Sequence, residues 1–291
     1  MRKRFLVLAI LAVAGLGTAA YFLKPVTGPA RDLTLVGDVE RGNYLIRLAG
    51  CVACHTNHDA GTGFLAGGYG LETAFGTFVP PNITSDPEAG IGRWTIQQFS
   101  DAMSNGMGPQ GHLYPAFPYE NYTLMSDQEI VDLYAALMAS EPVSTPAAES
   151  EIPFPFNMRL IMAGWQNLFF SPGRFEPEAG QSELYNRGKY LAYGPAHCIA
   201  CHTPRNALGA LEWDQAFAGS PGGTGGRAPA ITAAALIEEG YDVETLVQTL
   251  KDGFTPGFDV LGGSMEEVIS DSTSHWTDED LTALATYLLA E

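Results

Sequence analysis

Two short stretches of the chain carry the residues that could do chemistry. Both read Cys-x-x-Cys-His, with Cys51, Cys54 and His55 in the first half and Cys198, Cys201 and His202 in the second. In this spacing two thiols lie one helical turn apart and can add across the two vinyl groups of a porphyrin, and the adjacent imidazole faces the iron as proximal ligand. The motif pair therefore predicts two covalently bound c-type haems.

Other uses of such cysteines fit the pattern less well. A zinc site needs four ligands brought together, yet each motif supplies three and the second motif begins 147 residues after the first. A thioredoxin-like pair or a structural disulfide has no need of a histidine after both motifs. The chain has four cysteines in all, so the two predicted haems use every thiol.

The same spacing recurs elsewhere and indicates an internal repeat. "RGNYL" at 41–45 returns with a one-residue slip as "RGKYL" at 187–191, and Gly106 returns as Gly253. A repeat of this length predicts two copies of one module. Each copy is expected to have an N-terminal helix, the haem-binding turn, irregular loops rich in Gly and Pro, and a C-terminal helix.

The C-terminal helix of each copy has a sequence signal for its first residue. "SDQEIVDLYAALM" at 126–138 places Ser126 and Glu129 in capping-box positions, and "TDEDLTALATYLL" at 277–289 repeats this with Thr277 and Asp280. Between the copies, an apolar stretch at 156–170 contains Asn157 as a candidate cap. We expect it to be a helix that packs between the two domains, or one that touches a membrane or a partner subunit.

These elements predict an all-α fold of two tandem class I cytochrome c-like domains. The first is expected at 31–140 and the second at 181–291, joined by a linker at 141–180 that contains the interdomain helix. The linker begins with small, acidic and proline residues at 140–155. In such domains the haem itself supplies much of the core.

Residues 1–25 are predicted to be a membrane anchor or a signal. Arg2, Lys3 and Arg4 precede a run of nineteen uncharged residues at 5–23, nearly the length needed to cross a bilayer. The basic residues place the N-terminus in the cytoplasm, so the rest of the chain would be exported. We favour a retained anchor helix over a cleaved signal, for which Thr18-Ala19-Ala20 offers a small-residue site.

The charge of the chain excludes one class of partner. With 33 acidic and 15 basic residues the formal charge is −18, and no basic cluster follows the N-terminus, so nucleic acid is not expected as a partner. The acids form either a solvated surface or a docking face for a basic partner.

Several segments resemble a known family. "LAGGYGLETAFGTFVPPNIT", "GIGRW", "LYPAFPY", "PFNMRL", "HCIACHTPRNALGAL" and "GGSMEEV" resemble the cytochrome c subunits of bacterial membrane-bound alcohol, aldehyde and sugar dehydrogenases and their free-standing diheme relatives. The resemblance implies electron transfer at the periplasmic side of the inner membrane, from a dehydrogenase subunit to the respiratory chain. The acceptor would be a cytochrome, an oxidase or a quinone-linked protein. Many of these subunits carry a third haem domain, whereas two Cys-x-x-Cys-His motifs occur in this sequence.

The sixth ligand of the second iron is predicted to be Met265, the single methionine after Cys201, where the family places a ligating methionine. The repeat offset then predicts the first sixth ligand at Phe117 or Pro118, and neither side chain binds iron. Relatives that have Phe in this place often have Met just before the acidic helix start, which is Met125 here. Met125 is therefore the favoured ligand; Met103, Met107, His112 and an open position are the alternatives.

The remaining histidines, His58, His197 and His275, are expected at haem edges or on the surface rather than on iron. The leading interpretation is an electron-transfer protein and not an enzyme, because the sequence has no nucleotide loop or other catalytic cofactor motif. The alternatives are a diheme cytochrome c peroxidase, which needs an open iron, and a thiosulfate dehydrogenase of the type that needs a further cysteine. A membrane-tethered shuttle between respiratory complexes would share the chemistry and differ in its partner.

Overall fold

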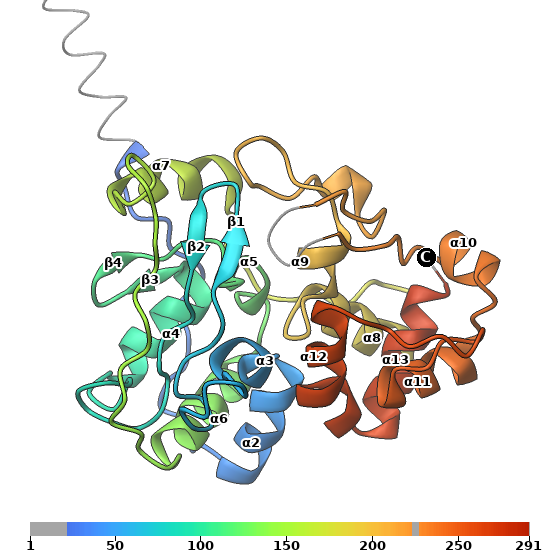
Figure 1. Ribbon diagram of the computed structural model, residues 1–291, viewed down its shortest axis with the longest axis horizontal. Coiled ribbons are helices and arrows are strands. Elements are labelled where there is room, and N and C mark those ends of the chain that lie inside the picture. Colours follow the sequence, from blue (N-terminus) through green and yellow to red (C-terminus); the bar gives the residue numbers. More distant parts are fainter. Residues whose placement is uncertain (1–21, 223–226, 291) are drawn as a thin grey trace, which may run out of the picture.

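The computed structural model describes residues 22–222 and 227–290. This part of the chain is predominantly helical and holds twelve α-helices, α2 to α13, with a few very short strands. Elements α2 to α7 lie on one side of the molecule and α8 to α13 on the other (Figure 1).

The first half is organised by a pair of crossing helices, α2 (Val39–Leu48) and α6 (Asp127–Met138). Ser126 and Glu129 form the predicted capping box at the start of α6, each bonding the backbone N–H of the other. The helices touch at Gly42, where a Cβ would overlap the backbone carbonyl of Asp132. Arg41, next to this glycine, forms an ion pair with the buried Asp132 side chain. The repeated Arg-Gly motif therefore marks a close helix crossing.

The second half repeats this crossing with α8 (Glu183–Tyr193) and α13 (Asp278–Leu288). Here a Cβ on Gly188 would overlap the carbonyl of Ala283. Arg187 donates two hydrogen bonds to the Asp280 carboxylate, at 2.7 and 2.9 Å. Thr277 caps α13 as expected, but Asp280 is engaged by Arg187 and does not complete a reciprocal capping box.

Eight further helices, of four to ten residues, complete the helical part of the described chain. Two of them, α4 and α11, end at glycines with positive φ, Gly106 and Gly253, which accounts for the repeat of these glycines in the sequence. The helices are α3 (Cys51–His55), α4 (Ile96–Asn105), α5 (Tyr119–Tyr122), α7 (Leu160–Phe169), α9 (Cys198–His202), α10 (Ala233–Glu238), α11 (Val243–Asp252) and α12 (Ser264–Asp271), with 3₁₀ turns η1 (Trp213–Gln215) and η2 (Thr273–His275).

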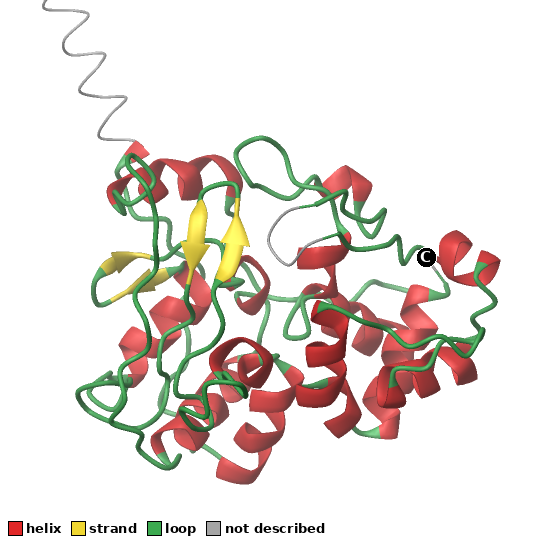
Figure 2. Ribbon diagram, viewed as in Figure 1, coloured by secondary structure: helices red, strands yellow, loops and turns green. Residues whose placement is uncertain are grey.

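The expectation of irregular loops between the helices was partly wrong. Two small antiparallel sheets lie in the first half, β1 (Leu71–Thr73) with β2 (Gly76–Phe78) and β3 (Met107–Gly108) with β4 (Gly111–His112) (Figure 2). Gly76 and Gly111 have positive φ at these turns, which glycine adopts without steric cost. Strands of two or three residues give too little alternation to be read from a sequence.

The two halves share buried surface. One continuous cluster of buried apolar side chains includes Leu45 and Leu133 from the first half and Leu191 and Leu284 from the second. Between the halves, Tyr44 donates a hydrogen bond of 2.7 Å to Asp280. These contacts tie α2 to the C-terminal half.

The linker runs along the first half and leads into α7. Val143 and Thr145 accept hydrogen bonds from the buried Asn82 side chain, at 2.8 and 3.0 Å. The predicted cap at Asn157 is wrong, because α7 begins at Leu160 and has no side-chain cap. Residues 154–157 form a turn before the helix.

The predicted anchor at residues 5–23 falls almost entirely outside the described residues, which begin at Phe22. From residue 22 onward, in the described ranges, no helix combines the length and the apolar character that a bilayer crossing requires.

Candidate functional site

The two Cys-x-x-Cys-His motifs form two short helices, α3 and α9, of the same length and with similar ends. Each follows a residue in the left-handed region, Gly50 with φ 65° and His197 with φ 42°. The helical spacing places both cysteines of each motif on successive turns of one helix. This is the geometry that attachment to two vinyl groups requires.

The histidines of both motifs, His55 and His202, are held in the same way. The Nδ1 atom of His55 lies 2.6 Å from the carbonyl oxygen of Pro81, and the Nδ1 atom of His202 lies 2.8 Å from that of Pro229. A carbonyl can only accept, so Nδ1 carries the proton and Nε2 keeps its lone pair for a metal. Both imidazoles have the tautomer that a haem iron needs.

The protonation state agrees with this role. Burial lowers the pKa of His55 to about 4, against a smaller opposite effect of the Pro81 carbonyl, and burial also lowers the pKa of His202. Both imidazoles are therefore neutral at neutral pH, and a neutral imidazole is the form that ligates a metal.

The backbone after each motif forms an equivalent hydrogen bond in both halves. Gly67 donates its N–H to the carbonyl of His55 at 2.9 Å, and Gly219 donates to that of His202 at 2.8 Å. Each bond closes a loop that returns to the attachment helix. The shared construction indicates that both motifs hold the same kind of group.

The four cysteines are unpaired with one another. Burial raises the pKa of Cys51 and of Cys198 to about 12, so both thiols are protonated at neutral pH. Reactive cysteines of redox pairs have lowered pKa values, which argues against a thioredoxin-like role. Among the described residues no group of three or more His, Cys, Asp or Glu side chains converges as a metal site.

The two attachment helices approach each other through the residues that precede them. A Cβ on Gly50 would lie 3.4 Å from the Nε2 atom of His197. The His197 ring packs edge-on against Tyr122 with ring centroids 5.6 Å apart, and Tyr122 donates a 2.7 Å hydrogen bond to the carbonyl of Ala49. His197 is thus a half-buried contact between the two motifs.

An equivalent backbone hydrogen bond occurs in each half and shows which residue of the first half corresponds to Met265. Leu113 donates its N–H to the carbonyl of Gly106, and Leu261 donates to that of Gly253, both at 2.8 Å. Counting four residues on from each leucine aligns Phe117 with Met265. Met265 is half-buried in the first turn of α12. The register agrees with the predicted replacement of a methionine by Phe117.

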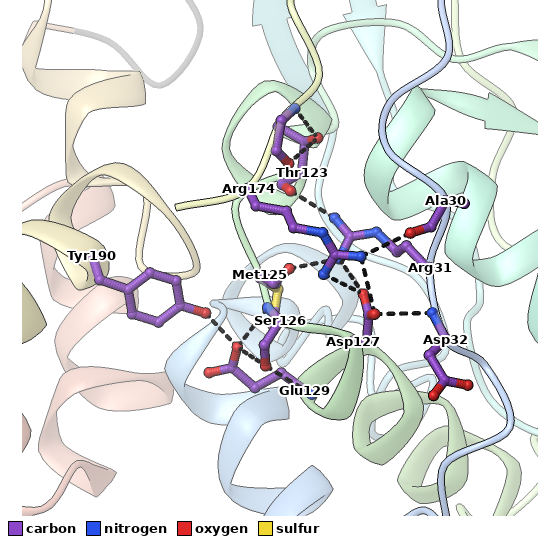
Figure 3. Close-up of polar contacts among 11 residues, drawn as sticks. Ala30, Arg31, Asp32, Thr123, Met125, Ser126, Asp127, Glu129, Arg174 and Tyr190 are labelled. Atoms are coloured by element: carbon purple, nitrogen blue, oxygen red, sulfur yellow. Dashed lines mark hydrogen bonds and ion pairs between the residues drawn. The ribbon is translucent and has the colours of Figure 1, made fainter. Parts of the chain in front are cut away.

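Met125 is fully buried and immediately precedes the N-cap of α6. The guanidinium of Arg31 donates hydrogen bonds of 2.6 Å to the carbonyls of Met125 and Thr123, and one of 3.2 Å to Asp127 (Figure 3). From the other half, Tyr190 donates a 2.6 Å hydrogen bond to Glu129 at the start of α6 (Figure 3). The segment that carries Met125 is fixed from both sides.

The other candidate ligands have different surroundings. His112 is buried, and its Nδ1 atom lies 2.7 Å from the Oε1 atom of Gln166 on α7. Met103 is buried within α4, as expected for a helix-core residue, and Met107 is half-buried on β3. His58 is an exposed partner of Asp271 at 2.9 Å, which links the loop after α3 to α12.

Two kinds of functional residue were missed at the level of sequence. Pro81 and Pro229 could have been found, because each begins a repeated Pro-x-Ile-Thr at 81–84 and 229–232. Arg31 has no such signal, since its partners are backbone carbonyls more than ninety residues away.

Three known proteins that are similar to this chain are c-type cytochromes or cytochrome subunits of dehydrogenases. No family model matches the chain. It is 38% identical over 287 residues to the diheme cytochrome c-type protein of Cereibacter sphaeroides, covering 97% of this chain and 95% of that protein. It is 36% identical over 283 residues to the fructose dehydrogenase cytochrome subunit of Gluconobacter japonicus, and 37% identical over 265 residues to the gluconate 2-dehydrogenase cytochrome c subunit of Pantoea cypripedii.

The alignments cover 96% and 86% of this chain but only 57% and 58% of those two dehydrogenase subunits. The names of the relatives confirm the resemblance stated from the motifs. They also confirm the prediction of an electron-transfer protein rather than a catalytic one, because the relatives are cytochrome subunits and a diheme cytochrome. The chain belongs to the family of diheme c-type cytochromes.

Proposed function

We propose that the chain binds two haems covalently, one through Cys51 and Cys54 and one through Cys198 and Cys201, and passes single electrons between protein partners. The observation that carries this proposal is the pair of proximal histidines, His55 and His202, each oriented by a proline carbonyl and each neutral. A bound haem supplies an iron that cycles between ferric and ferrous states.

We propose Met265 and Met125 as the sixth ligands. For Met265 the support is its alignment with Phe117 across the repeat, at the place where the resemblance implies a ligating methionine. For Met125 it is complete burial just before α6, together with the Arg31 hydrogen bonds that fix its backbone. A thioether ligand stabilises ferrous iron relative to imidazole, so both sites would suit a carrier of relatively high potential.

The proposed organisation has a class I cytochrome domain at 31–140 and a second one at 181–291, with 141–180 between them and a membrane anchor at 1–25. The repeated crossings of α2 with α6 and of α8 with α13 support this division. The shared core supports a fixed arrangement of the two domains, which electron transfer between two centres requires.

The proposed donor is a dehydrogenase subunit, because the fructose and gluconate dehydrogenase relatives are cytochrome subunits of such enzymes. The proposed acceptor is a cytochrome, an oxidase or a quinone-linked protein of the respiratory chain, at the periplasmic side of the inner membrane. The excess of acidic side chains favours a basic partner, and nucleic acid has no place in this scheme.

The haem content of the full chain, expressed with the haem-attachment machinery, tests the proposal. The pyridine haemochrome spectrum should give two haems per chain, and the denatured chain should retain both haems during electrophoresis. The double variant Cys198→Ala with Cys201→Ala should retain one haem, as should Cys51→Ala with Cys54→Ala. A wild-type chain with one haem or none would contradict the proposal. A separate experiment, copurification with a dehydrogenase subunit, tests the proposed donor.

A further inference from the structure

The outer face of α7 is apolar although it is exposed. Leu160 is 58% and Leu168 is 59% exposed, and Ile161 is also exposed between them. With Gly164 these residues follow the spacing of one helix face. Phe154 and Met158, just before the helix, extend this apolar surface; Phe154 is 77% exposed.

The opposite face of the same helix is already used. Trp165 donates a 2.9 Å hydrogen bond to the carbonyl of Leu208 in the second half, and Gln166 is buried against His112 and Gly106 in the first. Thus α7 does pack between the halves, as one sequence interpretation expected. A surface helix normally has polar residues on its outer face, but no residue of α7 is charged.

The N-terminal segment joins this surface. The side-chain amide of Asn167 on α7 donates hydrogen bonds to the carbonyls of Lys24 at 2.8 Å and Phe22 at 3.3 Å. Phe22 and Leu23 line a shallow apolar depression together with Met158, Leu160, Ile161 and Gly164. In Figure 1, α7 lies beside the start of the described chain. The uncharged run at 5–23 therefore ends on α7 itself.

The charge around this surface differs from the rest of the molecule. Residues 1–31 and 152–175 contain no Asp or Glu, although the chain has 33 acidic residues. Lys24 follows Leu23 in the chain, and Arg159 lies between Met158 and Leu160, where its guanidinium donates a 3.0 Å hydrogen bond to the His112 carbonyl. Bilayers present apolar chains beneath phosphate groups, so an apolar face with basic margins matches them.

We propose that the outer face of α7, with Phe22, Leu23, Phe154 and Met158, lies against the lipid bilayer surface, an inference that rests on the proposed N-terminal anchor. If residues 5–23 cross the bilayer, the chain is fixed to α7 at the point where it leaves the apolar layer. The exposed leucines of α7 then lie at the depth of the acyl-chain boundary, and the molecule has a set orientation on the membrane. The bilayer thus covers the apolar face that the protein leaves open.

Nitroxide labels on the full haem-loaded chain test this in proteoliposomes of phosphatidylethanolamine and phosphatidylglycerol. Single variants Leu160→Cys and Leu168→Cys are labelled, with Ile237→Cys on α10 as the matched control, since Ile237 is an apolar residue 61% exposed. Each label is also measured under nitrogen, so that relaxation by the haem iron, which is common to both collision measurements, can be subtracted. Power-saturation EPR compares collisions with oxygen, which concentrates in lipid, and with a water-soluble nickel chelate.

The proposal predicts a higher oxygen-to-nickel ratio at 160 and 168 than at 237, by several-fold. The haem spectrum of each variant shows that it is folded. Ratios at 160 and 168 equal to that at 237, in protein that sediments with the vesicles, would overturn the proposal and leave the anchor intact. Protein that stays in the supernatant would instead refute the anchor, and with it the proposal. Labels that become protected only after the dehydrogenase subunit is added would assign the surface to that partner and refute contact with lipid.

Discussion

Replacing Arg31 tests how the segment that carries Met125 is held. Arg31 donates hydrogen bonds of 2.6 Å to the carbonyls of Thr123 and Met125, and its side chain is almost fully buried. Arg174 provides a matched control, because it binds the same Asp127 carboxylate but neither of these carbonyls. The variants Arg31→Met and Arg174→Met thus both break an ion pair with Asp127, and only the first frees the turn before α6.

The expected magnitudes follow from these contacts. A hydrogen bond to a charged group contributes about 1.5–3 kcal/mol, so losing two should cost Arg31→Met about 3 kcal/mol or more. Arg174 is partly exposed, and its loss should cost about 1 kcal/mol or less. A cost of about 3 kcal/mol in holding the segment corresponds to about a 100-fold change in its opening equilibrium.

Two assays on the ferric protein measure these effects. Urea unfolding gives the loss of stability, and titration with imidazole, which displaces a thioether from iron, reports the opening of the Met125 segment. Arg31→Met should bind imidazole at one haem with about 100-fold higher apparent affinity, while Arg174→Met stays near the wild type. Equal losses of stability in the two variants would refute the role of the carbonyl contacts, and unchanged imidazole affinity in Arg31→Met would refute the link to the ligand.

Three further predictions concern the frame and the charge of the molecule. Gly42→Ala and Gly188→Ala should each lower the free energy of unfolding by about 1–3 kcal/mol in urea titrations, because the added methyl group overlaps a backbone carbonyl. Gly164→Ala, on the outside of α7, is the control. Its methyl group meets no atom within 4 Å, so this variant should be neutral or stabilising. Burial, opposed by Arg205, raises the pKa of Glu120 to about 7 from 4.5, so the folded state keeps this proton and stability should fall as pH rises between these values. Glu120→Gln should flatten that slope, and an unchanged slope would show that other groups cause it. Stopped-flow reduction by a basic donor should slow as salt rises, and rates that stay flat would indicate apolar docking.

The repeated elements could be predicted from sequence because local signals determine them. Ser126 and Thr277 were correct as N-caps, since capping depends on residues within one turn. The repeated Arg-Gly motif was recognised, but its meaning was not, because a close helix crossing depends on atoms that are distant in the chain. The same limit explains why Arg31 was missed.

Other misses have a different physical cause. The hairpins β1–β2 and β3–β4 are too short to produce a period, and Asn157 was taken as a cap although the turn before Leu160 leaves it outside the helix. The contact of His197 with the first motif could not be predicted from sequence, because it arises from the packing of two modules. The two Cys-x-x-Cys-His motifs could be found from sequence because each consists of five consecutive residues, which form one short helix.

The most direct test of the central claim, two haems each with histidine and methionine ligands, is low-temperature EPR of the ferric protein. Leucine keeps the apolar volume of methionine, so Met125→Leu and Met265→Leu should both fold. Each variant should convert one of the two low-spin haem signals to high spin, a different one in each case, and the double variant should convert both. If Met125→Leu leaves both haems low-spin while His112→Ala or Met107→Leu does not, the first haem has another ligand and the account is contradicted.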